Sequence, residues 1–343
     1  MNLSDFDYNL PKELIAQYPS KNRDESRLLV LRKDTGKIEH RTFKDIIEYL
    51  HEWDLLVLNN TKVIPAKLTG RKETGGRVEA LILFKGMVES EYEALLNPAR
   101  GCVVGKKIIF ANGAAEAEIT AVENGRRFLK FNSNGGMEKL LEKIGEMPLP
   151  PYIKRKECHI DRERYQTIYA SRDGAIAAPT AGLHFTTDIL NALSKRGIDI
   201  DYVTLHVGYG TFSPVKCEDI RNHRMEREYF EIDKDVVENG RNKKGRVIAV
   251  GTTSCRVLET VFSVPSPFTL NPPPTFGWTD LFIYPPYKFR IVDALITNFH
   301  LPKTSLLMLV SAFCGRDLLF KAYREAIKEG YRFYSYGDAM LIL

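Results

Sequence analysis

Residues 246–262 read RVIAVGTTSCRVLETVF, and this stretch decides the fold class of the chain. The pattern predicts a strand over residues 246–251 and a helix over residues 254–262, and alternation of strands and helices is typical of α/β domains. The turn between them holds one glycine and three hydroxyl residues, and backbone amides at a helix N-terminus bind carboxylates and phosphates. Threonine and serine before a helix are also ordinary caps, so both interpretations stay open.

Three further clusters of small, hydroxyl, amide and imidazole residues lie at predicted strand ends. They are residues 178–185 (APTAGLHF), 205–212 (LHVGYGTF) and 296–302 (ITNFHLP). In an open α/β sheet the carboxyl ends of the strands meet at one crevice, so we predict that the four clusters converge on one enzyme site. The residues expected to line a common pocket are His184, His206, Thr252 and His300.

The pattern changes character between residues 61 and 131. Short strand-like segments are interrupted there by Gly and Asn at the regular intervals typical of a small antiparallel barrel or sandwich. We therefore predict a mixed α/β fold, with a larger α/β domain (residues 1–60 and 152–343) and an inserted β-barrel-like domain (residues 61–151). Within the larger domain, strands are expected at residues 281–284 and 291–297. The proline-rich segment 263–275 is expected to be either a mobile lid or partner contact, or an inert insertion.

Composition argues against disorder, secretion and membrane insertion. Of 343 residues, 44% are hydrophobic and 27% charged, which is typical of a soluble globular protein. Residues 1–7 contain no apolar run, so no secretory signal is expected, and no apolar stretch is long enough to span a bilayer. The five cysteines show no CxxC spacing, which fits free thiols in a reducing compartment and predicts no structural zinc. We expect a cytoplasmic protein.

The formal net charge of +5 is distributed unevenly. Basic residues cluster at 154–156, 162–164, 221–227 and 241–246. Such patches assist binding to a polyanion such as RNA, although a mild basic excess is also common in proteins that bind no nucleic acid.

The histidines of the clusters are candidates for acid–base chemistry or for recognition of a ribose or base. Because no HxxxH or HxH spacing is present, we predict no metal site, and the alternative is separate core histidines. Glu228 closes the charged string RMERE (residues 224–228), where a solvated charged face competes with a catalytic carboxylate. Near the N-terminus, Arg23 and Arg27 flank Ser26, and an ion pair that fastens the turn competes with binding of a substrate anion.

Longer strings carry a resemblance to a known family. Among them are LPKELIAQYP (10–19), APTAGLHFT (178–186), TLHVGYGTF (204–212), GTTSCRVLE (251–259) and GWTDLFIYPPYKFRIVDALITNFHLP (277–302). In these strings the chain resembles the S-adenosylmethionine:tRNA ribosyltransferase-isomerases of bacterial queuosine synthesis, and the resemblance covers essentially the whole chain. Two departures are Glu226, where the family is expected to carry histidine, and Pro286, where it is expected to carry glycine.

The resemblance implies that the ribosyl part of S-adenosylmethionine is transferred to 7-aminomethyl-7-deazaguanine at the wobble position of a tRNA and isomerised. The product is epoxyqueuosine, and adenine and methionine are released. S-adenosylmethionine is then a co-substrate, no metal or redox cofactor is required, and a monomer is expected. Two alternatives are a noncatalytic RNA-binding module and a methyltransferase; the latter is disfavoured because no glycine-rich fingerprint follows a first strand.

The chemistry requires a base beside the sulfonium, a donor for the departing adenine and a pocket for the amine. The base candidates are His206, His184 and Glu228, with an imidazole favoured and His206 first. The methionine carboxylate is expected at the turn 251–254 or at Arg256. The full set of expected substrate-binding residues is Thr180, Gly182, Gly208, Gly210, Thr211, Gly251, Thr252, Thr253, Ser254, Arg256, Asn298 and His300.

Overall fold

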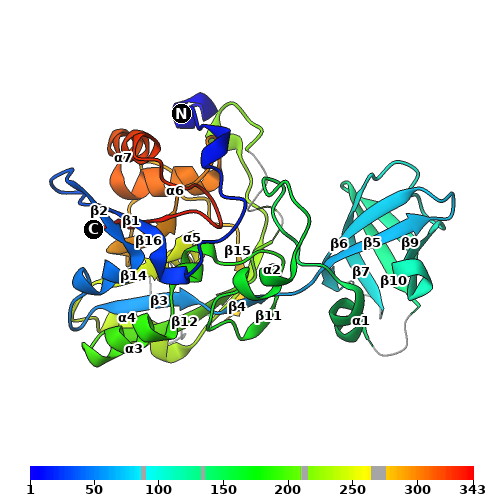
Figure 1. Cartoon of the computed structure of the whole chain (residues 1–343), viewed down its shortest axis with the longest axis horizontal. Coiled ribbons are helices and arrows are strands. Elements are labelled where there is room, and N and C mark those ends of the chain that lie inside the picture. Colours follow the sequence, from blue (N-terminus) through cyan, green and yellow to red (C-terminus); the bar gives the residue numbers. More distant parts are fainter. Residues whose placement is uncertain (86–89, 133–135, 209, 211–214, 264–275) are drawn as a thin grey trace. The chain divides into compact units, whose positions relative to one another are not determined.

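The computed structural model describes residues 1–85, 90–132, 136–208, 210, 215–263 and 276–343 (Figure 1). The chain divides into two compact units, each treated separately below. The first contains Met1–Lys62, Pro151–Arg155 and Glu163–Leu343, and the second contains Val63–Pro150 and Lys156–Arg162. The fold is therefore mixed α/β with an inserted barrel, as the sequence predicts.

A nine-stranded mixed sheet forms the centre of the first unit, in the order β15-β13-β12-β3-β14-β16-β17-β1-β2. The adjacent strands β12, β3, β14 and β16 are parallel, whereas β17 runs antiparallel to β16 and parallel to β1. The central strands are almost purely apolar because helices or loops cover both faces. The bounds are β1 Arg27–Leu31, β2 Ile38–Thr42, β3 Leu55–Asn59, β12 Asp199–Leu205, β13 Glu228–Ile232, β14 Val247–Val250, β15 Phe276–Thr279, β16 Ala294–Asn298 and β17 Ala339–Ile342.

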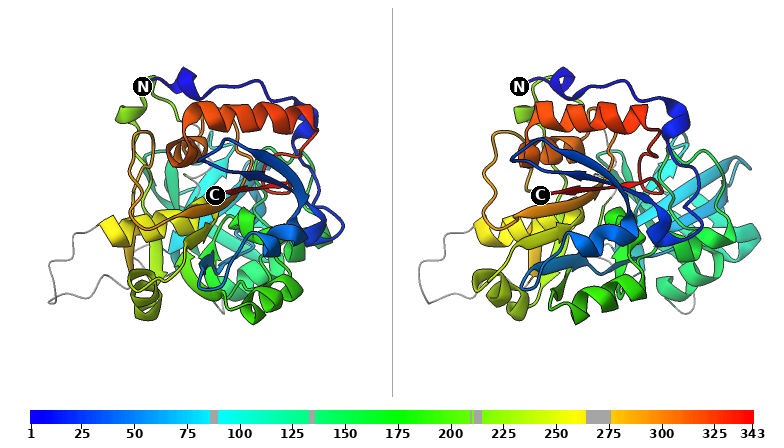
Figure 2. Two further views of the ribbon diagram at one scale, coloured as in Figure 1. Left: turned by 90° about the vertical axis from the view of Figure 1, so that its left-hand side faces the viewer. Right: turned by 60° about the vertical axis from the view of Figure 1, so that its left-hand side comes forward.

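Helices pack on both faces of this sheet (Figure 2). One core contains residues of α5 (Gly251–Ser263), α6 (Ser305–Cys314) and α7 (Arg316–Lys328). The other contains residues of α3 (Thr187–Lys195) and η4 (Phe43–Glu48). Strand residues alternate between the two cores because successive side chains point to opposite faces. The remaining elements of this unit include α4 Lys234–Arg241, η1 Leu3–Phe6, η2 Lys12–Leu14, η3 Arg23–Glu25, η6 Thr180–His184, η8 Ile220–Asn222 and β11 Arg172–Ala175, which pairs with β4 (Thr61–Val63).

The second unit is a closed antiparallel barrel in the order β10-β7-β6-β5-β8-β9. Its strands are short and alternate buried with more exposed positions, as the interrupted pattern of the sequence predicts. The helix α1 (Met137–Ile144) belongs to this unit and buries Met137, Leu140 and Leu141. The bounds are β5 Lys67–Lys72, β6 Arg77–Lys85, β7 Glu91–Asn97, β8 Lys107–Phe110, β9 Ala115–Glu123, β10 Arg126–Phe131 and η5 Ala111–Gly113, and a short helix α2 spans His159–Arg164.

Three expectations about elements need correction. Residues 281–284 form no strand; they are an irregular segment whose Ile283 is buried in the core, and the edge strand is β15 instead. The helix α5 begins at Gly251 rather than Ser254, and β16 begins at Ala294 rather than residue 291. A β-strand and an irregular buried segment both require a run of apolar residues, so the sequence pattern alone does not distinguish them. Of the proline-rich segment, residues 264–275 lie outside the described residues.

None of the helices in the described ranges has the length and apolar character needed to cross a membrane.

Candidate functional site

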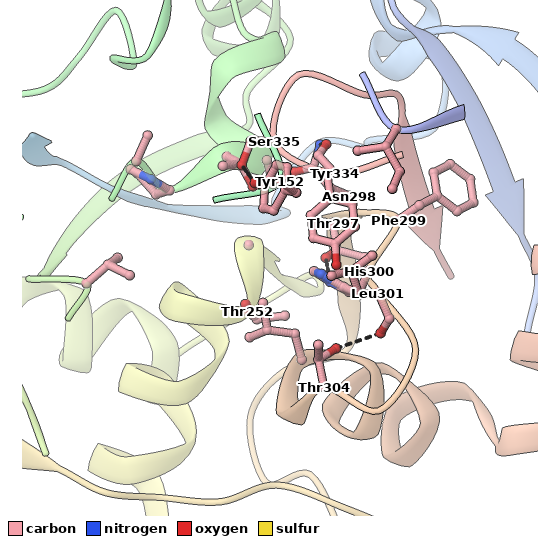
Figure 3. A pocket seen from close by; sticks show the side chains of 18 of the residues that line it. Tyr152, Thr252, Thr297, Asn298, Phe299, His300, Leu301, Thr304, Tyr334 and Ser335 are labelled. Atoms are coloured by element: carbon pink, nitrogen blue, oxygen red, sulfur yellow. Dashed lines mark hydrogen bonds between the residues drawn. The ribbon is translucent and has the colours of Figure 1, made fainter. Parts of the chain in front are cut away.

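A cavity of about 570 Å³ lies at the carboxyl ends of β14 and β16 (Figure 3). Each of the four clusters contributes to its wall, through Ala178–Ala181, Val207, Gly251–Thr253 and Thr297–Leu301. The predicted convergence of the clusters is therefore confirmed. Of the four residues expected to line it, however, only Thr252 and His300 do so.

The first turn of α5 forms one wall of the cavity. Gly251 has φ 89°, a left-handed conformation that favours glycine, and it turns the chain from β14 directly into the helix. Thr252 and Thr253 line the cavity, and the Thr253 hydroxyl has no hydrogen-bond partner in the described part of the chain. Ser254 instead donates to the carbonyl of Val250 at 2.9 Å, so its role is local. The wall thus presents amides and hydroxyls to a ligand.

A chain of hydrogen-bonded neutral polar groups supports another part of the wall. The Thr180 hydroxyl donates to Asn298 Oδ1 at 2.8 Å, and Asn298 Nδ2 lies 3.1 Å from His184 Nε2. His184 Nδ1 lies 2.7 Å from the Ser26 hydroxyl. Burial lowers the pKa of His184 to about 3, so the ring is neutral at pH 7. Thr180 and Asn298 line the cavity, but His184 lies behind them with both nitrogens occupied; its expected place in the pocket was wrong.

His300 is the imidazole that does line the cavity. Its Nε2 lies 2.9 Å from the Thr297 hydroxyl, and its backbone N–H donates to the Tyr323 hydroxyl oxygen at 2.9 Å. The Tyr8 hydroxyl donates to its carbonyl. Burial lowers the pKa of His300 to about 3, so this ring is also neutral and is a weak base.

His206 is next in sequence to the cavity-lining Val207, but its own side chain lies outside the cavity. Its Nδ1 lies 2.8 Å from the Thr61 hydroxyl, and its ring stacks on Tyr229 with centroids 5.9 Å apart. Burial lowers its pKa, although the carboxylates of Glu231 and Asp173 oppose that shift. His206 is therefore neutral near pH 7 and remains a stronger base than a fully buried imidazole.

Gly174 holds the His206 ring in place. A Cβ at Gly174 would lie 2.9 Å from Cε1 and Nε2 of that ring, and the residue has φ 144°. We expect Gly174→Ala to displace the imidazole, because the ring must move by a few tenths of an ångström or more. Since His206 is a candidate base, this misplacement is expected to lower turnover about tenfold. Single-turnover kinetics check this. Gly76→Ala, whose Cβ would meet only the end of the Lys72 side chain at 3.9 Å, is the control and is expected to retain the wild-type rate.

Glu228 is buried in an ion pair with Arg256, and each side chain is only 3% exposed. Its Oε1 also accepts a hydrogen bond from the backbone N–H of Gly208 at 2.8 Å, and Arg256 Nε donates to the carbonyl of Leu281 at 3.1 Å. The expectation of a solvated charged face is therefore wrong for Glu228, because it begins β13 inside the sheet. Neither residue lines the cavity.

The remaining predicted glycines pack closely against side chains. A Cβ at Gly182 would lie 2.1 Å from the Tyr169 hydroxyl, and one at Gly210 would lie 2.8 Å from Glu226 Cβ. Packing therefore accounts for both glycines without a ligand. Thr211 lies outside the described residues.

Several cavity residues were not predicted from the sequence. The polar ones among them are Lys12, Gln17, Tyr152, Lys154, Thr304, Tyr334 and Ser335. None of them stands directly at the end of a parallel strand, so the rule about strand ends does not find them; the signals for them are the string at residues 10–19 and the basic cluster at residues 154–156. Among the described lining residues the two lysines are the only charged ones. The cavity is therefore suited to an anionic group.

Arg23 and Arg27 hold the N-terminal segment in place through hydrogen bonds to backbone carbonyls. Arg23 donates to the carbonyls of Leu183 and Glu163 at 3.1 and 3.0 Å. Arg27 donates to the carbonyl of Glu329 at 2.6 Å. Their guanidinium groups thus tie the N-terminal segment to the rest of the unit, and neither lines the cavity.

No group of three or more histidine, cysteine, aspartate or glutamate side chains in the described ranges is arranged to hold a metal ion.

Comparison with known proteins gives consistent results. Residues 3–342 match the family model described as queuosine biosynthesis protein. The S-adenosylmethionine:tRNA ribosyltransferase-isomerases of Acetivibrio thermocellus and Clostridioides difficile are 52% and 50% identical to the chain, in each case over all of both chains. A crystal structure of S-adenosylmethionine tRNA ribosyltransferase from Thermotoga maritima is 39% identical, with a TM-score of 0.56 over 99% of this chain and all of that one. The chain therefore belongs to the queuosine biosynthesis family, that of the S-adenosylmethionine:tRNA ribosyltransferase-isomerases.

Proposed function

We propose that this protein transfers the ribosyl moiety of S-adenosylmethionine to 7-aminomethyl-7-deazaguanine in tRNA and isomerises it, giving epoxyqueuosine and releasing adenine and methionine. The observation that carries this proposal is the 52% identity over the full length of both chains. The cavity is consistent with the reaction because its volume of about 570 Å³ falls within the range of small-molecule sites.

S-adenosylmethionine occupies this cavity in our proposal. Its methionine carboxylate binds at the first turn of α5, where amides and the unpartnered Thr253 hydroxyl meet, because a helix N-terminus attracts negative charge. Lys12 and Lys154 add positive charge to the cavity. Thr180, Asn298 and His300 are placed to contact the ribose and the base, since each lines the cavity and carries a polar group.

We assign the base to His206, which precedes the cavity-lining Val207, so the 5′ carbon of the bound substrate must extend past Val207 to reach the imidazole. The sulfonium acidifies the adjacent 5′ carbon, so a moderate base is sufficient. His184 and His300 are weaker bases, because burial lowers their pKa to about 3. The carboxylate of Glu228 is occupied by Arg256 and by the Gly208 amide. In this assignment His184 positions Asn298, Glu228 positions Gly208, and the His206 imidazole removes the proton.

The tRNA is the second substrate, and an anticodon loop offers unstacked bases that can enter a pocket. The exposed lysines at the cavity supply phosphate contacts. We propose that the protein acts as a monomer, which sedimentation at micromolar concentration with and without tRNA tests directly.

Label distribution tests the function. Purified protein is incubated with tRNA carrying 7-aminomethyl-7-deazaguanine and with S-adenosylmethionine labelled either in the ribose or in the methyl group. Ribose label in the tRNA, together with free adenine, is the expected result. Methyl label in the tRNA would instead indicate a methyltransferase, and absence of both labels with retained tRNA binding would indicate a noncatalytic RNA-binding module.

The double variant Lys12→Ala, Lys154→Ala is expected to bind tRNA about tenfold more weakly at physiological salt. Each lost phosphate contact lowers the slope of log K against log salt by about 0.7 to 0.9. Filter binding across a salt series measures both quantities. The matched control is Lys195→Ala, Lys234→Ala, two exposed lysines that do not line the cavity. Unchanged tRNA affinity with lost S-adenosylmethionine binding would place Lys12 and Lys154 in the small-substrate site alone.

A further inference from the structure

We propose that the Tyr334 hydroxyl donates a hydrogen bond to the adenine of S-adenosylmethionine and stabilises adenine as it leaves. The inference rests on the proposed function and names a further residue for that reaction. Three independent features of Tyr334 support it: its position, its unpartnered hydroxyl and its backbone conformation.

Tyr334 lies in the wall of the cavity beside another aromatic ring. Its ring centroid is 4.0 Å from that of Tyr152, with an angle of 39° between the planes. Figure 3 shows Tyr152 and Tyr334 on one side of the cavity and Thr252 and Thr304 on the other. Two aromatic rings on one wall suit a planar base, and the α5 turn on the far side suits the carboxylate at the other end of the substrate.

The Tyr334 hydroxyl is buried and has no hydrogen-bond partner in the part of the chain that the structure describes. Three neighbouring tyrosines, in contrast, have partners for their hydroxyls. Tyr152 is bonded to the Ser335 hydroxyl, Tyr8 donates to the His300 carbonyl, and Tyr323 accepts from the His300 amide. Buried polar groups are almost always hydrogen-bonded, so an unpartnered hydroxyl in a cavity wall indicates a ligand that completes it.

The backbone of Tyr334 has φ 76°, in the left-handed region that bulky residues avoid. Three hydrogen bonds hold it there. Its N–H donates to the Phe299 carbonyl at 3.1 Å, and its carbonyl accepts from Asn298 Nδ2 at 3.3 Å and from the Gly337 amide at 2.9 Å. Strained residues persist where the surroundings enforce them, and they cluster at functional sites. Here the enforced conformation accompanies a side chain that lines the cavity.

The hydroxyl keeps its proton and can donate a hydrogen bond, because burial raises the pKa of Tyr334 far above neutrality. When the bond between ribose C1′ and adenine breaks, its electron pair moves to the adenine ring nitrogen. A fixed donor in a water-poor cavity stabilises that developing charge, and the proton stays on Tyr334 throughout. The departing adenine takes its proton from solvent water, so Tyr334 assists the departure without acting as the acid.

Tyr334→Phe tests this inference, because it removes only the hydroxyl and keeps the ring beside Tyr152. Adenine release is measured in a single turnover with tRNA and S-adenosylmethionine, and the Kd of S-adenosylmethionine is measured by calorimetry. We expect the single-turnover rate to fall about tenfold while the Kd changes less than about threefold. The unfolding midpoint without substrate is expected to be unchanged or higher, since an unpaired buried polar atom has been removed.

The matched control is Tyr169→Phe. Its hydroxyl is also buried and lacks a partner in the described part of the chain, but it does not line the cavity. We expect a wild-type rate for this control. A wild-type rate for Tyr334→Phe, or a raised Kd with an unchanged rate, would overturn the role in adenine departure. Absence of adenine release from the wild-type protein would instead refute the proposed function itself.

Discussion

His206→Ala is expected to lower the single-turnover rate about a hundredfold or more, while S-adenosylmethionine and tRNA still bind. The imidazole is neutral near pH 7 and packs against Gly174 and Tyr229 in one orientation. Its loss removes the base and none of the residues that line the cavity, so the wall that holds the rest of the substrate stays intact while the 5′ carbon beyond Val207 loses its base. Rapid-quench measurement of adenine release, with binding measured separately, distinguishes chemistry from affinity.

The pH dependence of the wild-type rate provides a second readout for His206. A base acts in its deprotonated form, and burial shifts the pKa of His206 below its ordinary value. The rate should therefore be flat near neutrality and should fall as the pH drops through that lowered pKa. The matched variant is His223→Ala, another imidazole with a lowered pKa that does not line the cavity. A wild-type rate for His206→Ala would move the role of base to another group.

Arg256→Met is expected to destabilise the protein by about 3–5 kcal/mol, because it removes the buried guanidinium that balances the charge of the Glu228 carboxylate. Denaturant unfolding followed by circular dichroism measures the loss, and the slope of the transition shows whether the folded state stays compact. Methionine keeps much of the arginine stem, so lost packing contributes little.

Two further variants isolate the buried charge. The double variant Arg256→Met, Glu228→Gln should recover much of the lost stability, because no unpaired charge remains. The same substitution at an exposed ion pair, Arg221→Met opposite Asp219, should have little effect. If the double variant were as unstable as Arg256→Met alone, packing rather than the unpaired carboxylate would be responsible.

The sequence predicted the parts of the fold that depend on local pattern. The strand–helix unit around Gly251 shows hydrophobic periodicity, and the strands of the barrel are separated by turn residues. Both patterns can be recognised in the local sequence. The segment 281–284 did not follow this logic. Its apolar residues are buried by tertiary packing without a neighbouring strand, and only the three-dimensional structure shows that.

The candidate site was predictable where it follows strand ends and not elsewhere. Thr252, Asn298 and His300 were found because parallel strands bring their carboxyl ends together. Lys12 in η2 and Tyr152 and Tyr334 in loops are distant in sequence, and nothing local in their neighbourhood specifies a cavity. The sequence also did not reveal that His184 lies outside the cavity wall, because its hydrogen bonds to Ser26 and Asn298 join segments far apart in the chain.

The position of β17 has a consequence for the synthesis of the protein on the ribosome. This strand follows every other strand of the sheet in sequence, yet it pairs with β16 on one side and with β1 on the other. Until residues 339–342 emerge, the nascent chain carries two hydrophobic strand edges without partners, which is a hazard for aggregation. The central sheet, and with it the segment around Tyr334, can therefore be completed only after residues 339–342 have been synthesised. The facing edges of β16 and β1 therefore stay open to wrong pairing until β17 inserts between them.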